Sequence, residues 1–255
     1  MNYQEKSRTI VVTVLGAIWR GLDSVRKVTH LFLMLFVLMA FISALSGSAP
    51  SMPKSAVLSI QPSGALVEEL AGSPYDRAIA ELMDQSAPQT LISDLVDSLD
   101  YARNDDRIKG VHLELSGFAG GSTAKLSIVA DAIRGFQESG KPVIASADYY
   151  SQGSYYLASL ADEAYMHPQG IAFIQGFGSF RPYFSEAIDK LMLDWNVFRV
   201  GKYKSFIEPY TRMDMSDESR EALNNVIEQL WEVYLVDVES ARGLDEGTIA
   251  DMVNN

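Results

Sequence analysis

The chain has 255 residues, of which 47% are hydrophobic and 21% charged, and its net charge is −12 at neutral pH. This composition suffices for one globular domain plus a separate hydrophobic segment, and the acidic excess argues against nucleic acid as a partner. The chain has no cysteine, so disulfides and a thiolate nucleophile are excluded. A zinc site would have to use carboxylates and the histidines His30, His112 and His167, whose spacing does not indicate one. We therefore expect no metal and no cofactor.

Two apolar stretches precede the main part of the chain. Residues 9–19 are too short to span a membrane and end at Arg20, which predicts an interfacial helix within a basic cytoplasmic segment, residues 1–27. Residues 28–46 contain an uninterrupted apolar run at 31–42 and have about the minimum length for a transmembrane helix. They are predicted to form a single membrane anchor.

The charges around this span predict its orientation. Arg26 and Lys27 directly precede it, which places the N-terminus in the cytoplasm and everything after Gly47 on the other side. A cleaved signal peptide is the alternative, because Ala44-Leu45-Ser46 is a tolerable small-x-small site. The long lead before the span favours retention as an anchor. Residues 47–54 have linker composition.

Strand and helix patterns alternate over residues 55–255, which predicts an α/β domain with a parallel sheet and clefts at the carboxyl ends of its strands. Strands are expected at 56–60, 108–115, 141–147, 164–166, 171–174 and 196–200, and helices at 90–103, 122–138, 182–193 and from Ser216 onward, the last with an apolar stripe that includes Leu230 and Tyr234. Residues 63–88 are expected to be loop and short helix, and Ser205 and Glu208 fit a capping box. The last residues, 243–255, look like the start of another segment, so the chain is expected to stop within a domain.

Several polar residues lie where such a sheet exposes side chains, and each has a plain structural alternative. The glycine turn at 116–121 follows a strand and either forms an oxyanion hole or is a tight turn. Ser151 and Ser154 lie at the start of a predicted helix, where they are either nucleophile candidates or helix-capping residues. Lys204 follows the 196–200 strand and is a candidate base if it is shielded from water; otherwise it is a surface lysine. Asp94, Asp97 and Asp100, three residues apart, are expected to be a solvated helix face.

Four sequence blocks together resemble a known family. They are Gly117-Phe118-Ala119-Gly120-Gly121, residues 150–159 from Tyr150-Ser151-Gln152-Gly153 onward, Pro168-Gln169-Gly170, and residues 198–205 with Glu208-Pro209. With the basic start, the interfacial stretch and the single anchor, they resemble the amino-terminal half of the long-form bacterial signal peptide peptidases, the protease IV family. The Val-Gly-x-Tyr-Lys-Ser block at 200–205 is the most specific part.

The resemblance implies a membrane-anchored serine/lysine peptidase with a ClpP/crotonase-like fold of repeated βαβ units, which assembles as a tetramer and degrades released signal peptides. It implies that Lys204 is the general base. The nucleophilic serine and a Ser-Pro-Gly-Gly turn are expected in a second repeat that is absent here, since Gln152 occupies the nucleophile position and residues 118–121 replace the turn. The neighbouring Lys202 is expected to point to the opposite face of the strand.

Three functions remain open. The first is the peptidase half, with hydrophobic peptides and the bacterial inner membrane as partners and a periplasmic main domain; a residual dyad of Ser151 and Lys204 is a minor variant. The second is a catalytically inactive, membrane-tethered scaffold. The third, a crotonase-type acyl-CoA enzyme, is disfavoured by the expected export of the domain.

Overall fold

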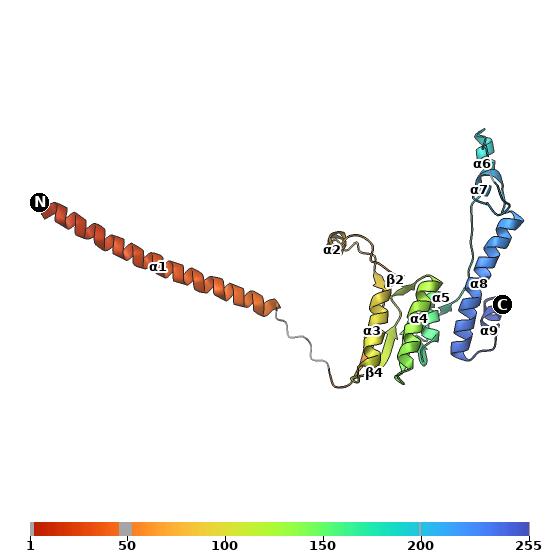
Figure 1. The fold of residues 1–255 in the computed structure, drawn as a ribbon, viewed down its shortest axis with the longest axis horizontal. Coiled ribbons are helices and arrows are strands. Elements are labelled where there is room, and N and C mark those ends of the chain that lie inside the picture. Colours follow the sequence, from red (N-terminus) through yellow and green to blue (C-terminus); the bar gives the residue numbers. More distant parts are fainter. Residues whose placement is uncertain (1–2, 46–52, 199, 255) are drawn as a thin grey trace. The chain divides into compact units, whose positions relative to one another are not determined.

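The structure is a computed structural model that describes residues 3–45, 53–198 and 200–254 (Figure 1). The chain divides into two compact units, Met1–Met52 and Pro53–Asn255. Each unit is described by itself below.

The described part of the first unit is a single helix, α1 (Tyr3–Leu45). Within it, Thr13–Ser43 is long and apolar enough to cross a membrane by length and composition. The two apolar stretches expected as separate segments are thus continuous in one helix. Asp23 contacts Arg26 and Lys27 at 2.7 Å each, and ion pairs at this spacing stabilise a helix. The end of the predicted span and most of the linker, residues 46–52, lie outside the described residues.

The second unit alternates strands and helices. In chain order the elements are β1 (Ala56–Ile60), β2 (Gly64–Val67), α2 (Pro74–Leu82), β3 (Gln89–Leu91), α3 (Ile92–Asn104), β4 (Ile108–Glu114), β5 (Phe118–Gly120), α4 (Thr123–Gln137), β6 (Val143–Ala147), β7 (Tyr150–Ser151), α5 (Gln152–Ser159), β8 (Glu163–Met166), β9 (Ala172–Phe173), α6 (Ser185–Lys190), α7 (Glu208–Thr211), α8 (Asp217–Arg242) and α9 (Thr248–Asn254).

The strands of this unit pair in parallel. The largest sheet has the order β1-β4-β6-β8, a second has the order β3-β2-β5, and β7 pairs with β9. Helices α4 and α5 connect parallel neighbours of the largest sheet, so the sheet is built from β-α-β units. The predicted α/β class with a parallel sheet is therefore confirmed.

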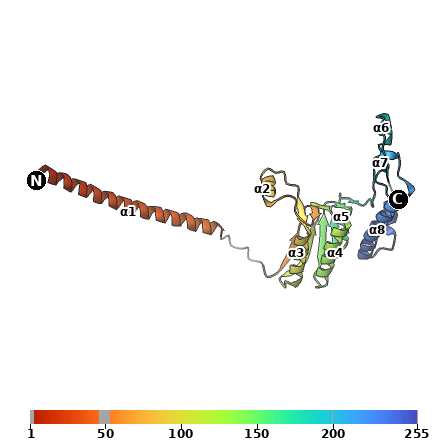
Figure 2. The same cartoon turned by 45° about the horizontal axis from the view of Figure 1, so that its top comes forward.

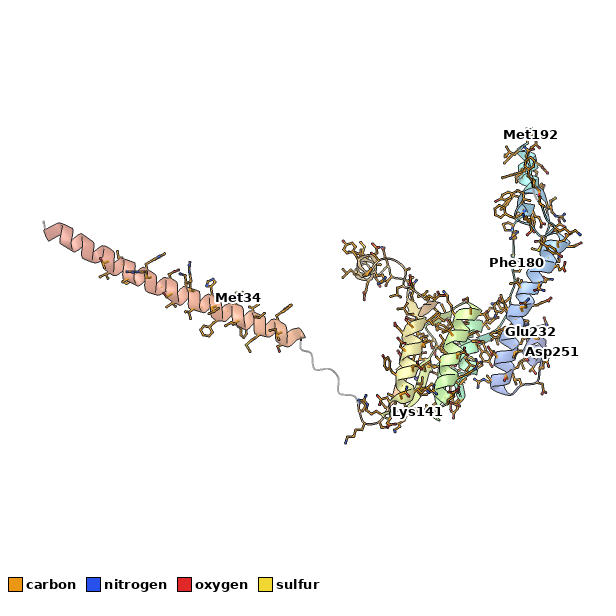
Figure 3. All side chains as sticks on the ribbon, in the orientation of Figure 1. Met34, Lys141, Phe180, Met192, Glu232 and Asp251 are labelled. Atoms are coloured by element: carbon orange, nitrogen blue, oxygen red, sulfur yellow. The ribbon has the colours of Figure 1, made fainter. Side chains whose placement is uncertain are left out.

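Helices α3 and α4 run side by side in both ribbon views and enclose the main core against the sheet (Figure 2). Alternate residues of β4 and β6 are buried, as expected for strands covered on that face. Leu99 and Phe136 are among the most buried side chains of the two helices. Lys141 (labelled in Figure 3) donates from Nζ to the carbonyls of Ala102, Arg103 and Asp105 at 2.8–3.0 Å, so it caps the C-terminal end of α3.

Two parts of the predicted element list need correction. Residues 63–88, expected as loop and short helix, also contain β2, and β3 follows directly. The expected strand at 196–200 is wrong: its described residues are not in a strand, and Arg199 lies outside the described part. Phe198 and Val200 are 98% and 83% exposed. Strand-forming residues adopt a strand when a neighbouring strand and a packed face are available, and this segment lacks the packed face.

The segment before α8 also differs from expectation. α6 is shorter than the predicted helix, and Met192 just beyond it has a φ of +55°, which does not continue a helix. The capping box of Ser205 and Glu208 is not formed, because Ile207 is the N-cap of α7 and makes no side-chain cap. Glu208 is instead buried and accepts hydrogen bonds from the backbone N–H and the hydroxyl of Ser216. Ser216 caps α8, as predicted.

Candidate functional site

The main candidate site is a cavity of about 550 Å³ in the second unit. The glycine turn, the first residues of α4 and α5, the segment after β9 and the middle of α8 enclose it. Its lining residues are Ala119, Gly120, Gly121, Ser122, Thr123, Ala124, Leu126, Ser151, Gln152, Gly153, Tyr156, Phe173, Gln175, Phe177, Leu230 and Tyr234. Most of these side chains are small or apolar, and the volume lies within the range of about 300–1,000 Å³ usual for ligand pockets.

The cavity forms where the sequence places the ends of two parallel strands. The glycine turn follows β4, and α5 begins shortly after β6, so both reach the carboxyl edge of the sheet. Gly120 has a φ of +91°, and a Cβ on Gly153 would lie 3.2 Å from the Cα of Gly120. The two backbones approach so closely because neither residue carries a side chain. The predicted glycine turn is real, although three of its residues form the short strand β5.

Ser151 and Ser154 form a reciprocal cap at the start of α5. The N–H of Ser154 donates to Ser151 Oγ at 3.2 Å, and the N–H of Ser151 donates to Ser154 Oγ at 2.8 Å. The two hydroxyls are themselves 3.1 Å apart. This geometry corresponds to the capping alternative for both residues.

Gln152 holds the segment that follows β9. Its side-chain oxygen Oε1 accepts hydrogen bonds from the backbone N–H groups of Gln175 and Gly176, at 3.0 and 2.9 Å. An amide has no nucleophilic role in acyl transfer, so the residue at the expected nucleophile position makes structural contacts. Sequence reasoning identified this position but not its contacts, because the residues it binds are more than twenty positions away.

A polar network attaches α8 to α4 and α5. The hydroxyl of Tyr156 donates to Asp237, and Arg134 Nη2 lies 2.9 Å from the same carboxylate. Tyr156 is 1% exposed, and burial together with the Asp237 hydrogen bond raises the pKa of its phenol to about 12. Burial also raises the pKa of Tyr234, the next tyrosine along the cavity wall. The network keeps Leu230 and Tyr234 of α8 in place as part of that wall.

Aromatic contacts complete the cavity wall. Trp231 stacks on Tyr234 with ring centroids 5.1 Å apart, and its ring contacts Phe177 edge-to-face at 6.2 Å. The sequence stripe on α8 indicated Leu230 and Tyr234, but no sequence signal identified Phe173, Gln175 and Phe177 as the opposing wall. They are brought there by the β7–β9 pairing and by Gln152.

Lys204 lies away from this cavity. It is exposed in a turn region before α7, and the described residues between β9 and Lys204 contain no strand. The hydroxyl of the adjacent Tyr203 donates to Glu221 at 3.3 Å. At about 1.5 Å rise per residue, Glu221 lies roughly 14 Å along α8 from Leu230 of the cavity. The described residues therefore do not bring Lys204 together with Ser151 or the glycine turn, and the expected opposite orientation of Lys202 on a strand does not apply.

The remaining candidates are placed elsewhere. Asp94, Asp97 and Asp100 lie exposed on α3. The ring nitrogen Nε2 of His112 shares a hydrogen bond with Ser146 Oγ at 2.8 Å, and Nδ1 of His167 accepts from the N–H of Gln169 at 3.1 Å. Among the residues that the structure describes, there is no group of three or more His, Asp or Glu side chains arranged to hold a metal ion.

Comparison with known proteins finds relatives along most of the chain. Residues 135–254 match peptidase family S49. Protease 4 of Haemophilus influenzae is 34% identical over 92% of this chain and 40% of its own length. Protease 4 of Salmonella typhi is 34% identical over 88% of this chain and 38% of its own length. The chain thus spans about two fifths of the length of these relatives.

Among solved structures, an enoyl-CoA hydratase from Shewanella pealeana is similar over 64% of this chain and 75% of its own, with 15% identity and a TM-score of 0.27. A likeness at this level supports no functional comparison. The family match and the two bacterial relatives confirm the resemblance drawn from the motifs: over most of its length, this chain is similar to part of protease 4.

Proposed function

We propose that this chain is the half of a membrane-anchored serine peptidase that supplies the general base, Lys204, for cleavage of hydrophobic peptides such as released signal peptides. The observation that carries the proposal is the Tyr203-Lys204-Ser205 block, which lies within the residues that match peptidase family S49. The side chain of a free lysine titrates near 10.4 in water. Burial in apolar surroundings lowers the pKa of a lysine toward the range in which it accepts a serine proton.

The geometry supports a nucleophile that comes from outside residues 1–255. Ser151 and Ser154 are engaged in capping α5, and Gln152 bonds the backbone of the cavity wall. Lys204 is exposed. A complementary segment that covers Lys204 would both shield it from water and supply the serine.

Peptide hydrolysis by the complete protein that carries this chain tests the proposal. We expect Lys204→Ala to reduce kcat by about 10²–10⁴-fold, the usual contribution of a general base, with unchanged circular dichroism. Lys202→Ala is the matched control, because this lysine is two residues away and also exposed. Retained activity in Lys204→Ala, or an equal loss in Lys202→Ala, would remove Lys204 from the mechanism.

We also propose that α1 anchors the chain in the bacterial inner membrane with the N-terminus in the cytoplasm and the main domain in the periplasm. Arg26 and Lys27 before the most apolar part of α1 support this orientation. Because the chain has no cysteine, single cysteines report accessibility cleanly. A membrane-impermeant maleimide should label Lys202→Cys but not Gln4→Cys in intact spheroplasts, and the opposite pattern would reverse the orientation.

A non-catalytic scaffold is the second candidate, and exposed apolar side chains favour it. Phe180, Met192 and Phe198, all in the segment between β9 and α7, are 89–100% exposed. Exposed apolar side chains gathered in one segment are typical of an assembly surface. The scaffold predicts stable oligomers without peptidase activity, whereas the peptidase is proposed to be an active tetramer; light scattering combined with the hydrolysis assay separates the two.

A further inference from the structure

The side chain of Gln152 does more than fill the position of a missing nucleophile. One oxygen, Oε1, accepts from two consecutive backbone N–H groups, those of Gln175 and Gly176. Gly176 has a φ of +76°, a left-handed conformation that glycine adopts readily, so the chain turns directly after the two donors. Two donors converging on one acceptor hold a loop more firmly than a single bond does.

The segment held in this way forms one wall of the cavity. Phe173, Gln175 and Phe177 all line the cavity. The regular pairing next to this wall is short, since β9 has only two residues. Gly176 also lies close to α8, where a Cβ would be 4.0 Å from the ring of Trp231. The position of the wall therefore depends on Gln152 from one side and on Trp231 from the other.

The geometry points to Gln152 as a positioning residue that fixes the 173–177 wall and thereby sets which apolar side chains the cavity admits. The ligand class rests on the proposed function: an extended hydrophobic peptide that places one side chain in the cavity. The apolar lining from Leu126, Leu230 and the two phenylalanines of the wall suits such a side chain, and the half-buried Gln152 stays beneath the wall it supports.

Amide hydrogen exchange of the full chain in detergent directly tests whether Gln152 holds the N–H groups of Gln175 and Gly176. Gln152→Met keeps the length of the side chain but removes the acceptor, whereas Gln152→Glu keeps an acceptor for both N–H groups. We expect exchange at Gln175 and Gly176 to become about 10-fold faster or more in Gln152→Met and to remain slow in Gln152→Glu. Unchanged exchange at both amides in Gln152→Met would contradict the proposal that Gln152 holds this segment. Gln229→Met, on the exposed face of α8, controls for the introduction of a methionine.

Selectivity of peptide binding tests the consequence. Two peptides that differ only by Leu or Phe at one position are titrated against the chain, with Trp231 as the fluorescent reporter in a Trp19→Phe/Trp195→Phe background. We expect the ratio of the two dissociation constants to change by about 10-fold in Gln152→Met and to be restored in Gln152→Glu. A ratio that stays at its original value in Gln152→Met overturns the selectivity role.

These two measurements are independent of catalysis. Failure of the proposed function would appear as a complete protein that hydrolyses no peptide, while the exchange and binding results still decide the role of Gln152. A purely structural role of Gln152 would weaken binding of both peptides equally, and that outcome also overturns the assignment.

Discussion

Asp237 is the residue whose removal most sharply tests how α8 is attached to the domain. Its carboxylate is shared by Tyr156 of α5 and Arg134 of α4. Asp237→Ala removes both contacts at once. Because α8 contributes Leu230 and Tyr234 to the cavity, loosening this attachment also disturbs the site.

The expected magnitude follows from the burial of the two partners. Tyr156 is 1% exposed, and after the substitution its hydroxyl keeps only Ser127 Oγ at 3.4 Å, so the buried group costs about 1–3 kcal/mol. The Arg134 side chain is 42% exposed, so its lost ion pair contributes only about 0–1 kcal/mol. We therefore expect Asp237→Ala to lower the free energy of unfolding by about 1–4 kcal/mol.

Chemical denaturation in mild detergent, followed by tryptophan fluorescence, measures this change. The matched control is Asp131→Ala, which breaks an ion pair to the same arginine at 3.1 Å but from a carboxylate that is 77% exposed. This control should lose less than about 0.5 kcal/mol. Equal losses in the two variants, or a loss below about 0.5 kcal/mol for Asp237→Ala, would refute the reasoning that burial of Tyr156 dominates.

Three further predictions concern pH, capping and a glycine. The pKa of Tyr156 is raised from 10.0 to about 12 in the folded state, so the unfolded state loses this proton at lower pH than the folded state. The free energy of unfolding should therefore fall as pH rises from 10 toward 12. Denaturation at a series of pH values should show a shallower decline for Tyr156→Phe. Ser151→Ala should lower stability by about 1 kcal/mol through loss of the cap, and a fluorophosphonate probe should not label Ser151; mass-spectrometric detection of that adduct would show that Ser151 is a nucleophile. Gly170→Ala places a Cβ 2.2 Å from the carbonyl oxygen of Asp148 and should cost more than about 2 kcal/mol, whereas Gly140→Ala, with open space around its Cβ and only an unfavourable φ of +74°, should cost about 1 kcal/mol; equal melting temperatures for these two variants would contradict the steric argument.

Local patterns predicted much of the fold. The alternation between Ile108 and Met166 gave the β-α-β units in the correct order, and Ser216 marked the start of α8. These features depend on hydrophobic periodicity and capping chemistry within a few residues. The apolar segment before Lys204 has the same local appearance as a strand, but Phe198 and Val200 are exposed, so the pattern alone was misleading there.

The candidate site was only half predictable for the same reason. The glycine turn and the start of α5 were found because glycine and serine have recognisable conformational roles at such positions. The opposing wall was not found, because Phe173 and Phe177 look like ordinary apolar residues until Gln152 and Trp231 are seen to hold them. Contacts between residues far apart in sequence leave no local signature.

The sequence by itself determined that α1 is long and apolar enough to cross a membrane, that the fold is of the α/β class, and that a family motif surrounds Lys204, because each is written in a continuous run of residues. Only the tertiary structure decided that Gln152 supports the cavity wall, that Asp237 ties α8 to α4 and α5, and that Lys204 is exposed away from the cavity. The physical reason is that burial and hydrogen-bond partners are properties of packed neighbours, which the chain brings together only on folding.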